Sequence, residues 1–120
     1  MINRIKELAH IVYHTLGSGF SERVYHNAME VLLRKEGIPY ETERIVPVEF
    51  HGHTIGNMRA DLIVDKTLVV ELKATKALTT AMSTQTHKYL QLLNLREALL
   101  VNFPQPLGES CEIAVVVRDT

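Results

Sequence analysis

The sequence has little of what marks secreted and membrane proteins: it contains one cysteine and no apolar run near the roughly 20 residues that a membrane helix needs. The lone Cys111 cannot form an intramolecular disulfide, and its apolar neighbours favour a core or edge position over a role as nucleophile. Residues 1–14 show amphipathic helical spacing without a signal-peptide core. We therefore expect a soluble, cytoplasmic protein that does not enter a membrane.

Surplus charge is also absent. Thirteen Lys and Arg residues stand against 14 Asp and Glu residues, which gives a net charge of −1. A self-sufficient nucleic-acid binder usually carries a basic surplus. Any phosphate-binding surface must therefore be local, assisted by a metal ion, or completed by a partner.

The chain has the length of one ordinary domain, and its 46% hydrophobic residues suffice for one packed core. It shows no repeats, low-complexity tracts or linkers, so we expect a single domain over residues 1–120. Periodicity and turn residues predict helices at about 2–16, 21–36 and 79–94, and strands at 40–50, 58–64, 68–74, 98–102 and 112–117. Ser18 or Ser21 can cap the second helix, and Pro47 favours an edge or bulge position for the first strand. This order predicts an α/β domain with a mixed sheet flanked by helices.

Three charged residues lie inside the most apolar part of the chain, the predicted hairpin over residues 59–74. Alternation places Glu71 and Lys73 on one face of their strand, with Asp61 opposite or diagonal to Glu71 on the neighbouring strand. Carboxylates about 5 to 8 Å apart on adjacent strands can converge on one ion. Mg²⁺ prefers a few carboxylates, waters and phosphate oxygens, so this pair forms half of a divalent-cation site.

A second interpretation of these charges remains open at this point. Lys73 can simply pair with Glu71 or Asp61 on a solvated sheet face. The neighbouring "LIV" and "LVVEL" runs are typical of strands covered on both faces, which favours partial enclosure of the three charges. In an enclosed site, Lys73 can orient the attacking water or stabilise charge on a phosphate.

The helices before and after the hairpin carry polar residues toward the predicted sheet. In the second helix we expect an apolar arc of Val24, Tyr25, Ala28, Met29, Val31 and Leu32. Glu22 falls at the border of that arc, although a first-turn Glu is also favoured by the helix dipole alone. In the third helix Gln85 falls within a face that we expect to be buried, with Tyr89 one turn further along. Backbone groups or a site ligand can satisfy that glutamine.

Four histidines offer weaker signals. His10 and His14 have the i, i+4 spacing that can bind zinc, but no third ligand is evident, so solvated side chains are the favoured interpretation. His51 and His53 flank Gly52 at a predicted turn, where exposed loop residues are the favoured interpretation, although a loop histidine can touch a substrate phosphate.

Together, Asp61, Glu71-Leu72-Lys73, Glu22 and Gln85-x-x-x-Tyr89 resemble the PD-(D/E)XK nuclease superfamily, with Ala60 in place of the proline of its name. Gly19-x-x-Glu22-x-x-Tyr25 is similar to the signature of the GxxExxY proteins, a prokaryotic branch of that superfamily. The segments "RADLIV", "VVELKA" and "LLVNF" also look like that branch.

The resemblance implies a restriction-endonuclease-like core, a four-stranded mixed sheet flanked by helices. It implies Mg²⁺ or Mn²⁺ held by Asp61, Glu71 and the Leu72 carbonyl, with Glu22 contributing directly or through water. Lys73 would position the attacking water, and Gln85 and Tyr89 would support the site or the phosphate. The implied reaction is hydrolysis of a DNA phosphodiester.

Three functions remain as hypotheses. The first is a metal-dependent nuclease acting on DNA. The second is a nuclease-fold module for nucleic-acid binding or assembly, acting within a homodimer or protein complex, which the near-neutral charge favours. The third is a metal-dependent hydrolase of another phosphate ester, such as RNA or a nucleotide.

Overall fold

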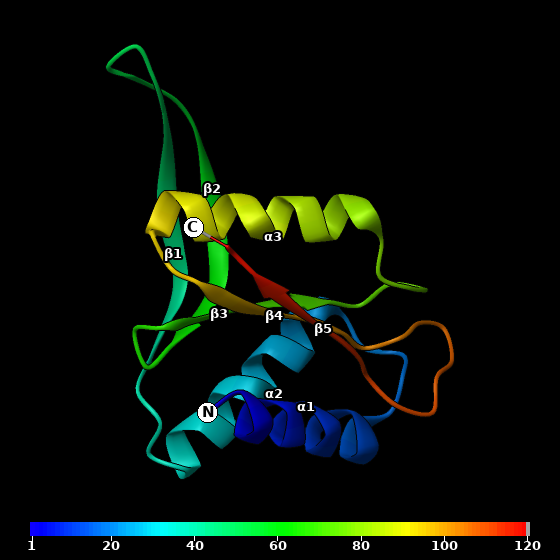
Figure 1. Cartoon of the computed structure of the whole chain (residues 1–120). Helices are drawn as coiled ribbons and strands as arrows, with labels where there is room; N and C mark the ends of the chain where they lie inside the picture. The colour runs from blue at the N-terminus through cyan, green and yellow to red at the C-terminus, as the bar shows by residue number, and fades with distance from the viewer. Residues whose placement is uncertain (120) are drawn as a thin grey trace.

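A computed structural model, which describes residues 1–119, shows a five-stranded mixed sheet with helices on both faces (Figure 1). The elements are α1 (Ile2–Leu16), α2 (Glu22–Lys35), β1 (Tyr40–Phe50), β2 (His53–Val64), β3 (Leu68–Lys73), α3 (Thr80–Leu93), β4 (Glu97–Asn102) and β5 (Glu112–Val117). The strands lie in chain order, and all neighbours are antiparallel except β3 and β4, which α3 connects. The predicted mixed sheet between helices is confirmed, with five strands where the resemblance implied a four-stranded core.

The two faces of the sheet bury different helices. Figure 1 shows α1 and α2 on one face and α3 on the other. Leu68, Val70 and Leu72 of β3 join the cluster under α1 and α2, whereas Val69 joins the cluster under α3. Because side chains alternate along a strand, Glu71 and Lys73 share the α3 side with Val69. The strand β3 is therefore covered on both faces, as its continuous apolar run predicted. No helix within residues 1–119 is both long enough and apolar enough to span a membrane.

The buried faces of α1 and α2 were predicted with different success. The predicted amphipathic spacing of α1 is confirmed, and its buried residues are Ile5, Leu8, Ala9, Val12 and Tyr13. In α2 the buried residues are Tyr25, His26, Met29 and Leu33, whereas Val24 and Val31 are 37% and 44% exposed. The prediction was wrong for these two valines because α2 packs against the sheet through residues 25, 29 and 33. Beside this buried row, only Ala28 and Leu32 of α2 pack partly against the core.

The helix α3 corrects the predicted position of Gln85. Thr86, Tyr89 and Leu90 are buried, and Gln85 is exposed, as are Ala81 and Leu92. Thr86 takes the buried position because its hydroxyl donates to the Met82 carbonyl at 2.9 Å, so it needs no partner from the sheet. The buried stripe is therefore narrower than the apolar residues of the helix suggest, and Gln85 lies outside it.

The strands β1 and β2 form a long hairpin that extends past the rest of the sheet (Figure 1). His51 and Gly52 both have positive φ, 49° and 79°, as a two-residue hairpin turn requires. This confirms the predicted turn, although β2 begins at His53 rather than near Met58. Pro47 lies in the edge strand β1, opposite Asn57 of β2, which confirms the predicted edge position.

Candidate active site

The candidate active site lies where the β2–β3 ladder opens. Backbone pairing ends at Leu62 and Val70. Beyond it the Leu72 N–H donates to Asp61 Oδ2 at 2.8 Å, and the Asp61 N–H donates to Glu71 Oε1 at 3.4 Å. Side chains thus replace backbone partners at this point, and the two carboxylates lie next to each other, as the alternation of the strands predicted.

Glu71 is the more deeply buried carboxyl of this pair. Its side chain is buried, with the residue only 4% exposed. Burial, followed by the negative charge of Asp61, raises the pKa of Glu71 to about 10. The charge of Lys73 opposes this rise without cancelling it, and a bound cation would stabilise the ionised carboxylate further.

Lys73 and Glu22 complete the charges around the pair. Burial raises the pKa of Glu22, the charge of Asp61 raises it further, and the charge of Lys73 opposes the rise. Glu22, in the first turn of α2, therefore lies within electrostatic reach of both β2 and β3. Among the ion pairs within residues 1–119, none joins Lys73 to Asp61 or Glu71. The surface-pair interpretation of Lys73 was therefore wrong.

The donor set suits a hydrated divalent ion better than a closed metal centre. Within the described residues, no group of three or more His, Cys, Asp or Glu side chains is gathered closely enough to hold a metal. The site offers the Asp61 and Glu71 carboxylates. Since the N–H and C=O of a strand residue face the same neighbour, the Leu72 carbonyl also faces the opening beside Asp61. Mg²⁺ is commonly held by one or two carboxylates and several waters, so these residues fit such an ion.

Tyr89 supports the site from α3. Its hydroxyl donates to the Arg59 carbonyl at 2.7 Å, two residues before Asp61. Burial, followed by the charge of Glu71, raises the pKa of Tyr89 to about 12, so the phenol stays protonated as a donor. Gln85 lies one turn earlier on the same side of the helix, and its exposed amide faces solvent rather than the core.

Tyr89→Phe is expected to lower the free energy of unfolding by about 1 kcal/mol, because the Arg59 carbonyl loses its donor. Urea denaturation measures the change. Ser110→Ala, which removes a hydroxyl from the exposed loop before β5, is the control and should leave the free energy of unfolding unchanged. Equal stability of Tyr89→Phe and the unmodified chain would show that this bond does not hold β2.

The start of α2 is held by aromatic contacts and glycines. Tyr25 stacks on Phe103 with ring centroids 4.5 Å apart, and its hydroxyl donates to the Gly17 carbonyl at 2.7 Å. Gly17 and Gly19 have φ of 71° and 106°, which favour glycine. Ser21 occupies the N-cap position, as one of the two predicted caps, but its side chain makes no capping bond. The spacing Gly19-x-x-Glu22-x-x-Tyr25 therefore has a physical meaning: a turn and an anchor that place Glu22.

Two buried polar residues of this region were missed in the sequence. Asn102, fully buried, accepts from the Thr75 N–H at 2.9 Å and donates to the Thr75 carbonyl at 3.1 Å and to Glu112 Oε1 at 2.8 Å. It thereby fixes the chain just past Lys73. The sequence feature that could have identified Asn102 is its position as a polar residue at the end of the apolar run "ALLVN", because a buried amide must find hydrogen-bond partners.

His26 is the second missed residue. Its Nε2 lies 2.9 Å from Thr42 Oγ1 and 2.9 Å from Glu30 Oε2, which ties α2 to β1. It lies one turn after Glu22, so this contact also fixes the helix that carries Glu22. The only sequence signal was its position within the buried stripe of α2.

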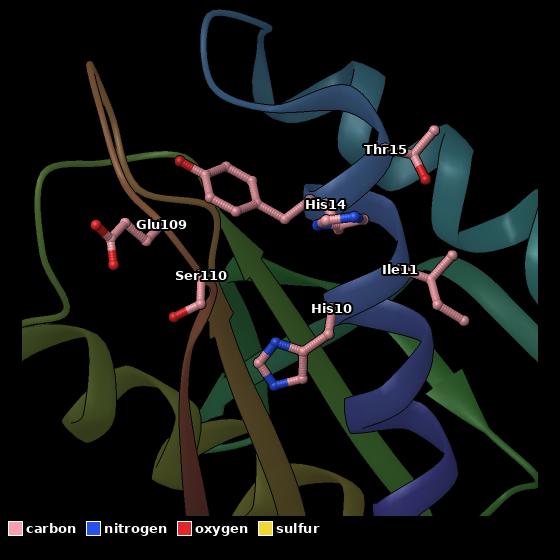
Figure 2. A pocket seen from close by; sticks show the side chains of 7 residues that line it. His10, Ile11, His14, Thr15, Glu109 and Ser110 are labelled. Atoms are coloured by element: carbon pink, nitrogen blue, oxygen red, sulfur yellow. The ribbon is translucent and has the colours of Figure 1, made fainter.

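The other candidates do not form sites. Cys111 is buried against the Ala9 carbonyl, and burial raises its thiol pKa to about 12, which confirms a core residue rather than a nucleophile. His10 and His14 line a cavity of about 370 Å³ with Glu109 and Ser110. Figure 2 shows the Glu109 carboxylate pointing away from the two imidazoles. His51 and His53 are exposed at the hairpin turn.

Comparison with known proteins agrees with this fold. The family model of the PD-(D/E)XK nuclease superfamily matches residues 1–113, so the chain belongs to that superfamily. Nucleases of this superfamily generally use divalent metal ions. No curated protein matches the chain.

Two solved structures are similar in fold. The crystal structure of SSO0001 aligns with a TM-score of 0.61 and 20% identity over 82% of this chain, which spans only half of that protein's length. An alkaline exonuclease from Laribacter hongkongensis aligns with a TM-score of 0.48 and 12% identity, over 99% of this chain and 71% of the exonuclease. The first likeness supports the fold, whereas the second is too weak to support an argument about fold or function.

Proposed function

We propose that this protein is a Mg²⁺- or Mn²⁺-dependent nuclease that hydrolyses DNA phosphodiester bonds. The observation that carries the proposal is the carboxylate pair of Asp61 and Glu71 at the opened end of the β2–β3 ladder, with Lys73 on the same strand face as Glu71. Membership of the superfamily supports nucleic acid as the substrate. On the spacing Gly19-x-x-Glu22-x-x-Tyr25, we place the chain in the GxxExxY branch.

Each residue then has a separate role. Asp61, Glu71 and the Leu72 carbonyl would hold the divalent ion, with Glu22 adjacent to it or linked through water. When bound, the ion supplies positive charge that stabilises the phosphate in the transition state and lowers the pKa of a water molecule. Lys73 orients the attacking water and offsets charge on the phosphate. Gln85 donates from the surface to a phosphate oxygen, and Tyr89 holds β2 in place.

One observation favours a second candidate, a nucleic-acid-binding or assembly module with little cleavage of its own. The net charge of the chain is −1. A chain without a basic surplus gains affinity for duplex DNA when a second copy or another protein adds positive charge. This candidate predicts a stable homodimer or complex, and DNA affinity that persists in EDTA.

Asp61→Asn tests the nuclease proposal. We expect the unmodified chain to cleave DNA in Mn²⁺ and not in EDTA, and Asp61→Asn to cleave at least ~10³-fold more slowly, because the metal loses a charged ligand. Asp65→Asn, at the exposed turn between β2 and β3, is the matched control and should cleave normally. Calorimetric titration with Mn²⁺ reports binding separately from cleavage.

The substrate panel distinguishes the remaining alternatives. Single-stranded, duplex and branched DNA are assayed beside RNA and nucleotides under the same conditions. If no DNA is cleaved but RNA or a nucleotide is, the protein is a hydrolase of another phosphate ester. If nothing is cleaved and DNA binding survives chelation, the binding module is correct and the nuclease proposal fails.

A further inference from the structure

We propose that Gln105 is a positioning residue for Glu22, acting through the turn that joins α1 to α2. This inference rests on the proposed function, in which Glu22 stands beside the metal and the substrate. Gln105 follows β4 in the chain, 83 residues after Glu22, and no sequence motif connects the two. Their connection comes from the fold alone.

The side chain of Gln105 makes three hydrogen bonds. Its Oε1 accepts from the Gly19 N–H at 2.8 Å. Its Nε2 donates to Tyr25 Oη at 3.0 Å and to the Phe103 carbonyl at 3.2 Å. One amide therefore joins the turn before α2, the first turns of α2 and the segment after β4.

The chemistry of the partners fixes the orientation of this amide. The Gly19 N–H can only donate and the Phe103 carbonyl can only accept, so the oxygen must face Gly19 and the nitrogen must face Phe103. Tyr25 Oη then accepts from Gln105 and donates its own proton to the Gly17 carbonyl at 2.7 Å. A single chain of bonds thus runs from Phe103 through Gln105 and Tyr25 to Gly17.

The turn over residues 17–21 needs this support. Gly19 and Phe20 are exposed, and the N-cap Ser21 makes no side-chain capping bond. The first turn of α2, which carries Glu22, begins directly after the turn. Displacement of a catalytic group by about 1 Å can cost ~10²-fold in rate, so a loosened turn should reduce activity without unfolding the core.

A double-mutant cycle between Gln105 and Glu22 tests the inference. We expect Gln105→Ala to slow Mn²⁺-dependent cleavage about tenfold in the unmodified chain and less than about twofold in Glu22→Gln, because the two residues act on one step. Gln105→Glu keeps an acceptor for Gly19 but cannot donate to Phe103, so it should behave as Gln105→Ala. Gln91→Ala, at an exposed glutamine of α3, is the control and should cleave normally.

Amide hydrogen exchange gives a readout that does not depend on activity. Exchange at Gly19 should be about tenfold faster in Gln105→Ala and unchanged in Gln91→Ala, because only the first variant removes its acceptor. The role of Gln105 would be overturned if Gln105→Ala left exchange at Gly19 unchanged. It would also be overturned if Gln105→Ala slowed cleavage equally in the unmodified chain and in Glu22→Gln.

The four proteins of the cycle are the unmodified chain, Gln105→Ala, Glu22→Gln and the double variant. They also separate this inference from the proposed function. If the unmodified chain binds Mn²⁺ but cleaves nothing, the proposed function fails, and the cycle is read from Mn²⁺ affinity instead. The positioning role is supported if Gln105→Ala lowers the Mn²⁺ affinity of the unmodified chain but does not lower the Mn²⁺ affinity of the Glu22→Gln variant. Additive losses of affinity, or no Mn²⁺ binding by the unmodified chain, contradict it.

Discussion

Glu71→Gln is expected to make the metal-free protein more stable at pH 8 and to abolish its stabilisation by Mn²⁺. Burial and the charge of Asp61 raise the pKa of Glu71 to about 10, so at pH 8 folding forces this carboxyl to remain protonated at a free-energy cost. A glutamine amide carries no charge, can still accept from the Asp61 N–H, and can donate to the Asp61 carboxylate. The expected gain is about 2–4 kcal/mol in the free energy of unfolding.

The pH dependence has a definite sign. Between the ordinary value of 4.5 and about 10, folded Glu71 retains a proton that the unfolded chain has released. The unfolded state binds fewer protons in this window, so the stability of the metal-free protein falls as pH rises through it. Below pH 4.5 the Glu71 contribution is fully present, and it is lost as pH rises through about 10. In Glu71→Gln this part of the pH dependence should disappear.

Urea denaturation at pH 5, 7 and 9, in EDTA and in Mn²⁺, measures these effects. In the unmodified chain Mn²⁺ should stabilise most at pH 9, because it binds the ionised carboxylates. Glu109→Gln, in the exposed loop before β5, is the control and should keep the full response to pH and Mn²⁺. A Glu71→Gln variant that still gains stability from Mn²⁺ would show that Glu71 is not a ligand.

The sequence was most informative where a pattern is local. Alternation along two strands was enough to bring Asp61 and Glu71 together, and the hairpin turn at His51 and Gly52 follows from its glycine. The mixed sheet between helices also followed from the order of helices and strands along the chain.

The sequence was least informative where burial depends on distant neighbours. A helical wheel does not show how wide the buried stripe is, so Gln85 was placed inside it and Thr86 was overlooked. Asn102 and Gln105 hold the site through partners 27 and 86 residues away in the chain, at Thr75 and Gly19. Such contacts become visible only when the chain is folded. The two carboxylates of the candidate site were therefore easier to predict than the residues that pack around them.

Lys73→Met is expected to reduce DNA cleavage by about 10²–10⁴-fold while Mn²⁺ binding persists or becomes tighter. Methionine keeps most of the apolar length of lysine and removes its ammonium group. The positive charge of Lys73 lowers the pKa of both Glu71 and Glu22, so it competes with a cation for the same carboxylates. Its removal should therefore favour the metal and harm only the step that needs the ammonium group.

Calorimetric Mn²⁺ titration and single-turnover cleavage, measured on the same preparations, separate these two effects. Lys35→Met, at the end of α2 remote from Glu22, is the matched control and should change neither quantity. Since no ion pair within residues 1–119 joins Lys73 to Asp61 or Glu71, its replacement leaves no broken pair to destabilise the site. Loss of Mn²⁺ binding together with cleavage would show that Lys73 maintains the site, whereas loss of cleavage alone places its ammonium group in the reaction.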